Sequence, residues 1–136
     1  MKTIIRILVV GFLAFTLNLK VSSQETEVFT LVETMPEFPG GNEALKEFIS
    51  ENIIYPAEAK AEGIQGKVFV AFTINHEGKV KDAEVVKGVH KLLDAEALRV
   101  VKEMPEWQPG EEDGKPVNVR YTLPVIFKLG AKPGDN

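Results

Sequence analysis

Apolar and polar residues alternate most regularly between Val117 and Leu129. Every odd position of this stretch is apolar or aromatic, and most even positions are polar. Because successive side chains of a strand point to opposite faces, the pattern predicts a long strand with one buried face. Pro124 interrupts it. Since proline has no N–H to donate to a neighbouring strand, it favours the edge of a sheet, with its nitrogen turned outward. Such an edge can bind another extended chain.

A hairpin is predicted in the middle of the chain. The stretch from Lys67 to Asn75 is apolar on both faces, which indicates a central strand. Residues 75–78 read Asn-His-Glu-Gly, a composition typical of a tight turn, so the stretch from Lys79 to Lys87 is expected to return as a second strand. The alternation in this second strand is irregular, and we therefore expect a bulge near Asp82.

The first helix is predicted after Asn42, a favourable N-cap residue, because apolar residues then recur at helical spacing as far as Asn52. A short helix from Ala57 to Glu62 is expected next. Gly63 would form its C-terminal stop, since glycine readily adopts the left-handed conformation that ends a helix.

The second main helix is predicted to begin at Asp94, again as N-cap, with Leu93 and Leu98 forming a hydrophobic staple across it. It would end at Pro105, because proline disfavours helical conformation in the residue before it. Trp107 lies between two prolines. We expect it to anchor the core, and the alternative is a platform that stacks on a ligand.

The order of these elements predicts an α+β fold. The first strand takes the centre because it is apolar on both faces, so the three strands form an antiparallel sheet of order 2-1-3. The two main helices are expected on one face of this sheet, where the apolar side chains of the strands need to be covered. We place the folded domain at residues 35–130, between a flexible tail at residues 24–34 and a frayed C-terminus at residues 131–136.

Residues 1–23 resemble a secretory signal. A basic start is followed by an apolar run, and Ser23 supplies a small residue for cleavage before Gln24. The alternative is a retained membrane anchor. The apolar stretch from Ile7 to Leu19 has 13 residues, whereas a membrane-spanning helix needs about 20. We therefore expect cleavage and secretion.

Composition excludes several classes of function. The chain has no cysteine, so it forms no disulfide. After cleavage its formal net charge would be −7, because all 20 acidic residues follow residue 23 while three of the 16 basic residues precede it. An acidic chain without a basic patch argues against nucleic acid as a partner.

No catalytic, metal or cofactor site is predicted. Ser50 is the single serine after residue 23 and has no histidine near it in sequence, so nucleophilic catalysis is not expected. The two histidines, His76 and His90, do not have the spacing of metal ligands. The acidic residues 111–113 could form an acid–base pair or a weak cation site, but flanking glycines favour a solvated turn. We therefore expect a binding protein and not an enzyme.

Six short motifs, in this order, resemble the C-terminal domain family of TonB, the energy-coupling protein of Gram-negative envelopes. They are Tyr55-Pro56-x-x-Ala59, Gly63-x-x-Gly66-x-Val68, Ile74-x-x-x-Gly78-x-Val80, Leu93-Asp94-x-x-Ala97, Met104-Pro105-x-Trp107-x-Pro109-Gly110, and the run from Gly114-Lys115-Pro116-Val117 through Leu123-Pro124-Val125-x-Phe127. The lead-in Met35-Pro36-x-Phe38-Pro39-Gly40-Gly41 is similar to that of Bacteroidetes-type members. The resemblance extends from about Met35 to Leu129.

The resemblance implies a periplasmic domain that binds the extended TonB box of outer-membrane receptors, in TonB-dependent transport of nutrients such as siderophores. In the family, the box adds a strand to the last strand of the domain, close to the segment before the Tyr-Pro motif. The expected peptide-binding residues are Asn118, Val119, Arg120, Tyr121 and Thr122 on the last strand, and Asn52, Ile53, Ile54, Tyr55 and Pro56 beside it.

Three roles are compatible with this resemblance. A full TonB has an N-terminal membrane helix, which engages an inner-membrane motor, and a long proline-rich linker. Here the tail from Gln24 to Glu33 could span at most roughly 35 Å, so a stand-alone module that binds receptors, itself or related TonB domains is the first expectation. An anchored energy transducer with an uncleaved N-terminus is the second. An envelope-associated dimerisation domain is the third.

Overall fold

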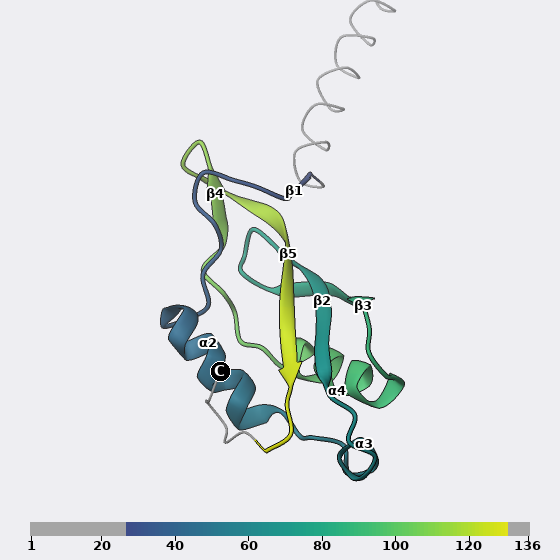
Figure 1. The fold of residues 1–136 in the computed structure, drawn as a ribbon. Helices are drawn as coiled ribbons and strands as arrows, with labels where there is room; N and C mark the ends of the chain where they lie inside the picture. The colour runs from purple at the N-terminus through teal and green to yellow at the C-terminus, as the bar shows by residue number, and fades with distance from the viewer. Residues whose placement is uncertain (1–26, 131–136) are drawn as a thin grey trace, which may run out of the picture.

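Five strands and three helices form the part of the chain, residues 27–130, that the computed structural model describes (Figure 1). In chain order they are β1 (Val28–Phe29), α2 (Gly41–Asn52), α3 (Ala57–Ala61), β2 (Gly66–Ile74), β3 (Val80–Lys87), α4 (Lys91–Lys102), β4 (Gly110–Glu112) and β5 (Lys115–Phe127). The expected signal at residues 1–23 and the frayed end at residues 131–136 lie outside the described residues. The fold is α+β, as predicted.

The three long strands have the predicted order. The sheet runs β1-β5-β2-β3, so the doubly apolar strand β2 is central, between its hairpin partner β3 and the last long strand β5. β2 and β5 are antiparallel and pair without interruption from Gly66 opposite Phe127 to Ile74 opposite Val119. The predicted strand count of three is wrong, because β1 and β4 also join β5. Both are too short for their residues to give an alternating pattern.

The β2–β3 hairpin contains the expected bulge. Ala71 pairs with Glu84 and Thr73 with Lys81, so two steps along β2 correspond to three along β3. Asp82 takes up the additional residue with a φ of 50°. The hairpin turn also requires its glycine, since a Cβ at Gly78 would lie 1.9 Å from the carbonyl oxygen of Trp107.

The predicted start of the first helix is wrong. α2 begins at Gly41, and its N-cap is Gly40, with a φ of 89° and no side-chain capping bond. Asn42 therefore lies inside the first turn. The chain enters α2 through a tight turn in which the Gly41 N–H donates to the Phe38 carbonyl at 2.7 Å. Two glycines at positive φ permit this turn, and they determine where the helix starts.

The predicted N-cap of the second main helix is wrong by one turn. α4 begins at Lys91, and its N-cap is His90, whose Nδ1 accepts from the Leu92 N–H at 3.2 Å. Asp94 lies in the first turn instead, and its carboxylate accepts from the N–H of Val89 at 2.9 Å. Leu93 is consequently a buried helical residue, so it cannot be the residue before the cap in a staple with Leu98.

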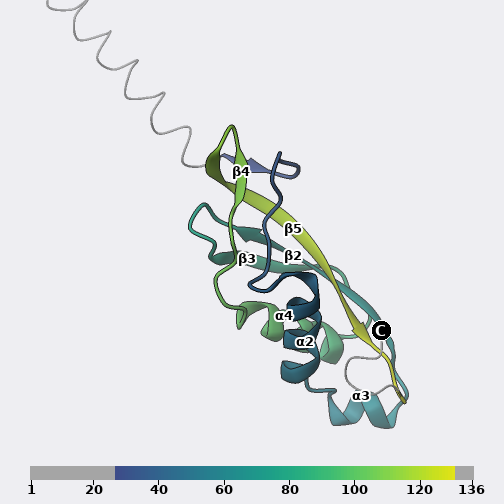
Figure 2. The same cartoon turned by 90° about the vertical axis from the view of Figure 1, so that its left-hand side faces the viewer.

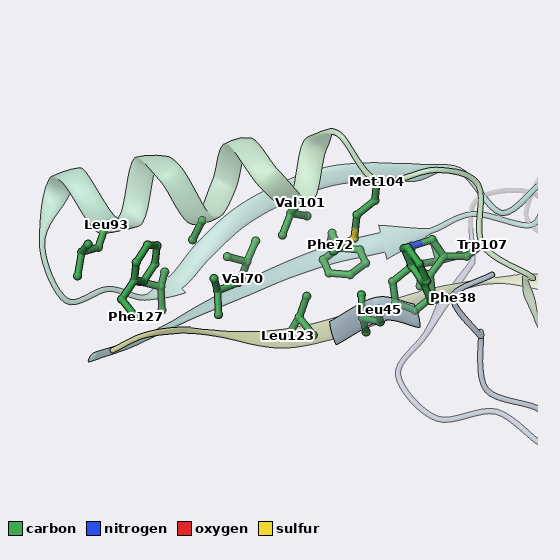
Figure 3. Close-up of a cluster of buried hydrophobic side chains, with 14 of the residues drawn as sticks. Phe38, Leu45, Val70, Phe72, Leu93, Val101, Met104, Trp107, Leu123 and Phe127 are labelled. Carbon is green, nitrogen blue, oxygen red and sulfur yellow. The ribbon is translucent and has the colours of Figure 1, made fainter. Parts of the chain in front are cut away.

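The core lies between the sheet and the two main helices, which share one face of the sheet as predicted. Core-facing residues of β2 and β5 cluster with Leu45 of α2 and with Leu93, Ala97 and Val101 of α4. Figure 3 shows Trp107 and Phe38 together at one end of this core and Phe127 near Leu93 at the other. Trp107 is 4% exposed, and its ring meets those of Phe38, Phe72 and Tyr121 at centroid distances of 5.5, 5.7 and 5.4 Å.

The segment expected as a flexible tail makes ordered contacts from Val28 onward. β1 runs parallel to β5, with Val28 opposite Asn118 and Phe29 opposite Val119. Further on, Thr34 exchanges two backbone hydrogen bonds with Glu111, at 3.1 and 2.8 Å. Figure 2 shows the segment passing from β1 beside β4 to α2. The prediction of an unfixed tail is therefore wrong for this stretch, because its anchors are backbone groups of β4 and β5 that the local sequence does not reveal.

Candidate peptide-binding edge

The outer side of β5 is covered over only part of its length. β2 pairs with β5 from Val119 to Phe127 on the inner side, and on the outer side β1 pairs with Asn118 and Val119 alone. Within residues 27–130, no strand pairs with the outer side of residues 120–127 (Figure 1). This stretch is the uncovered edge. Its outward backbone N–H and C=O groups are available to another extended segment.

Pro124 fits this edge without disturbing the sheet. It stands opposite Phe69, and the pairing of β5 with β2 continues on both sides of it. In an antiparallel pair, hydrogen-bonded and non-hydrogen-bonded positions alternate, so a proline is accommodated where its nitrogen faces away from the partner strand. The even-numbered residues of β5 then direct their backbone groups outward, and the outward row lacks one N–H, at Pro124.

Three of the predicted strand residues have side chains that are already engaged in the fold. Val119 is fully buried, and Tyr121 packs against Phe72 and Trp107. Arg120 donates to Thr73 Oγ1 at 3.2 Å, to the Asp82 carbonyl at 2.8 Å and to Glu84 Oε1 at 2.9 Å, all on strands β2 and β3. Of the three, Arg120 directs its backbone N–H and C=O outward, whereas those of Val119 and Tyr121 face β2. Arg120 can therefore offer a partner its main-chain groups, which suits recognition by strand addition.

Asn118 joins three parts of the chain at the covered end of β5. Its Nδ2 donates to the carbonyl of Glu27 at 3.1 Å, next to β1. Its Oδ1 accepts from the N–H of His76 at 2.9 Å, in the β2–β3 turn. Asn118 belongs to the predicted peptide-binding set, and in the structure it already binds the protein's own N-terminal segment.

The structure separates the two halves of the predicted site. Tyr55 packs edge-on against Phe127, with ring centroids 5.5 Å apart, and its hydroxyl donates to the carbonyl of Ile64. The segment Asn52 to Pro56 therefore flanks the C-terminal end of β5. A strand rises about 3.4 Å per residue, so Asn118 lies roughly 30 Å from this end and Thr122 roughly 17 Å. The two sets of residues mark opposite ends of one edge.

Two residues of α4, Glu96 and Arg99, hold this flanking segment in place. Glu96 Oε2 accepts from the N–H of Ile54 at 2.6 Å, and Arg99 Nη2 donates to the carbonyl of Asn52 at 2.8 Å. Glu96 and Arg99 also pair with each other at 2.7 Å. With its backbone bound in this way, the segment presents the side chain of Ile54, which is 67% exposed.

The environment of Glu96 favours its charged form. Burial raises the pKa of this carboxyl, but hydrogen bonds from Arg99 and from the Ile54 N–H, together with the Arg99 charge, outweigh that effect and lower the pKa below its usual value. Neither Glu96 nor Arg99 was predicted from the sequence to take part in the site. Their spacing of three on a helix is a visible signal for an ion pair, but nothing in the sequence indicates that the pair binds a segment more than 40 residues away.

Metal-binding groups and membrane-spanning helices were also sought between residues 27 and 130. Within this range, no group of three or more histidine, aspartate or glutamate side chains is arranged to hold a metal ion. The helices described there are also too short or too polar to cross a membrane.

Comparison with known proteins identifies close relatives of this domain. Residues 51–129 match the family model described as Gram-negative bacterial TonB protein C-terminal. The chain is 35% identical over 82 residues to Protein TonB of Helicobacter pylori and 35% identical over 79 residues to Protein TonB of Pseudomonas aeruginosa. These matches cover 60% and 56% of this chain but 27% and 22% of the relatives, so the chain spans about a quarter of their length.

A solved structure supports the same relationship. The solution NMR structure of the Helicobacter pylori TonB C-terminal domain superposes with a TM-score of 0.52 and 32% sequence identity. The superposition covers 65% of this chain and 94% of that domain.

Proposed function

Because this chain belongs to the family of Gram-negative bacterial TonB C-terminal domains, we propose that it binds the extended TonB box of outer-membrane receptors as a strand added to β5. In this role it is a periplasmic module of TonB-dependent transmembrane transport. Outer-membrane receptors are its partners, and recognition of an extended peptide is its biochemical activity.

The observation that carries the proposal is the partly covered edge of β5. β1 pairs with Asn118 and Val119, so this edge already accepts a parallel strand from outside the long antiparallel sheet. The uncovered edge, residues 120–127, continues directly from the covered positions. A receptor segment that pairs there would satisfy the outward backbone groups of β5 and would need no pocket for its side chains.

We place the receptor segment on the uncovered edge, with its end near Phe127 flanked by the segment Asn52 to Pro56. This position retains Arg120, Tyr121 and Thr122 from the expected set. It includes Asn118 and Val119 only when β1 leaves. Ile54 would contact an apolar side chain of the receptor segment, because its own side chain is exposed and its backbone is fixed by Glu96.

Amide chemical-shift mapping with a receptor-box peptide tests the proposal. We expect the largest shifts at residues 120–127, apart from Pro124, and a second group at Ile53 to Tyr55. A matched control peptide carries proline at alternate positions, so that it cannot donate along one side, and should bind much more weakly. Shifts centred on β3, at the opposite side of the sheet, would contradict both the binding edge and the mode of binding.

The same uncovered edge favours one second candidate, the pairing of two copies of this chain. Unpaired edges of two identical strands can join into a continuous sheet. Light scattering across a concentration series separates the candidates. A fixed dimer that ignores receptor peptides supports dimerisation, and a monomer that binds them supports the receptor-binding module.

A further inference from the structure

β1 and a receptor segment would use the same edge, and this overlap leads to an inference that rests on the proposed function. We propose that β1 is a displaceable strand of the protein itself, which competes with the partner for the outer edge of β5 at Asn118 and Val119. β1 thereby determines how long a partner segment the resting protein accepts. Nothing else between residues 27 and 130 pairs with the outer side of β5 at these two positions.

The contacts of β1 are few compared with those of the chain that follows it. β1 pairs with β5 at two residues only, and Val28 is 48% exposed. Leu31, two residues after β1, is 80% exposed. When this stretch detaches, the partly buried side chain of Phe29 becomes exposed to water, but Val28 and Leu31 are largely exposed already. Segments with few buried apolar contacts open most readily in local unfolding.

The chain after Leu31 is anchored independently of β1. Val32 is 8% exposed and Phe38 is 6% exposed, as part of the core. Between them, Thr34 pairs with Glu111, and Glu37 exchanges backbone hydrogen bonds of 3.0 and 2.8 Å with Gln108. β1 can consequently leave the edge while the rest of the N-terminal segment stays in place, and the entry to α2 is undisturbed.

Occupation of the edge is exclusive, because one outward N–H or C=O of a strand pairs with a single neighbouring strand at a time. A partner confined to residues 120–127 leaves β1 where it is. A partner that extends toward Asn118 meets β1 and has to replace it. Asn118 makes β1 harder to displace, because its side-chain amide also donates a hydrogen bond to the carbonyl of Glu27.

Two peptides and one variant test this competition. The short peptide spans only the uncovered edge, and the long peptide also spans Asn118 and Val119. In the variant V28P/F29P, β1 lacks its N–H donors and its pairing is lost. The exposed residue Leu31 provides a control, L31A, that leaves β1 unchanged.

The short peptide should bind the wild type, the control and V28P/F29P equally. The long peptide should bind V28P/F29P more tightly than the wild type, by roughly 2- to 10-fold for each hydrogen bond recovered. Equal affinity of the long peptide for all three proteins would overturn the inference and leave the proposed function standing. Absence of binding by either peptide to any of the proteins would overturn both.

A reversible disulfide between β1 and β5 gives a second test within one protein. The chain has no cysteine, so V28C/N118C introduces a single pair. These positions face each other in the β1–β5 register, and neighbouring strands lie about 4.8 Å apart, within the Cα range of a disulfide. The long peptide should shift the Val119 amide in the reduced form and not in the oxidised form. Equal shifts in both forms would show that β1 does not stand in the way.

Discussion

At its Asn118 end, β5 is paired on both sides, whereas toward Phe127 it is paired with β2 alone. The covered end is closed by the protein's own backbone and by one amide side chain. The open end is flanked by a loop that two charged residues of α4 hold in position. One strand thus carries both a protected edge and an available one. The difference arises from what lies beside the strand, since the odd positions are apolar or aromatic from Val117 to Phe127.

Trp107 packs against Tyr121 of β5 inside the core, and replacing it should have the largest effect. The change Trp107→Ala should lower the free energy of unfolding by roughly 3–5 kcal/mol, as for other buried aromatic residues. Denaturant unfolding measures this. The control Trp107→Phe should cost much less, because the buried Nε1 has no hydrogen-bond partner within residues 27–130. Unchanged stability of Trp107→Ala with lost peptide binding would instead identify Trp107 as a ligand platform.

Replacing Glu96 should loosen the loop beside the open end of β5, and the loss of stability should depend on pH. Its pKa is lowered in the folded protein, so its stabilising contribution is present above the unfolded carboxyl pKa of about 4.3 and is lost as pH falls through the folded value. Glu96→Gln should cost roughly 1–2 kcal/mol at neutral pH and little in acid. Denaturant unfolding at a series of pH values measures the difference from wild type.

Glu103 provides the control for this experiment. It also pairs with Arg99, at 3.0 Å, but its side chain is 53% exposed, so Glu103→Gln should change stability by less than about 0.5 kcal/mol. A pH-independent loss in Glu96→Gln would show that packing, and not charge, holds the flanking loop.

Asn118 should affect only the covered end. Asn118→Ala removes the bond to Glu27 and the bond to His76, each typically worth about 1 kcal/mol. Hydrogen exchange should become faster at β1 and in the β2–β3 turn, while the amides near Phe127 keep their protection. Equally faster hydrogen exchange at both ends of β5 would mean that the two ends open as one unit and are not independent.

Pro124 should have the smallest effect on stability and a visible effect on binding. Pro124→Ala adds one outward N–H to the uncovered edge and changes no bond to β2, so unfolding should change by less than about 0.5 kcal/mol. Peptide affinity or self-association should rise by roughly 2- to 10-fold. The reciprocal variant Thr122→Pro removes an outward donor and should weaken binding. A clear gain of stability in Pro124→Ala would show that the nitrogen at this position faces β2, because the new N–H could then donate to that strand.

The long strands could be predicted from sequence because each has a repeating pattern. The alternation in β5 and the two apolar faces of β2 determined the order of the sheet, and the broken alternation after Lys79 indicated the bulge at Asp82. β1 could not be predicted in this way, since two residues cannot show a period. Its pairing depends on backbone groups 90 positions away.

The sequence indicated the two parts of the candidate site, the edge strand and the flanking segment, but not how they lie relative to each other. Pro124 indicated the edge strand, and the Tyr-Pro motif indicated the flanking segment, but neither reveals which end of β5 that segment approaches. The contact between Tyr55 and Phe127 decides this in the structure. The helix starts were misplaced for a related reason. Asn42 and Asp94 are good capping residues, but the turns at Gly40 and His90 determine where each helix begins.

The continuous pairing of β5 with β2 also has a mechanical consequence. Nine consecutive pairs join the two strands, from Gly66–Phe127 to Ile74–Val119. A pull along the axis of β5 loads these pairs together in shear, whereas a pull across the sheet opens them one after another. A partner strand on the uncovered edge has a shorter ladder, which lacks the donor of Pro124. Under tension along that axis, the partner would therefore separate from β5 before β5 separates from β2, and the domain would survive each release intact.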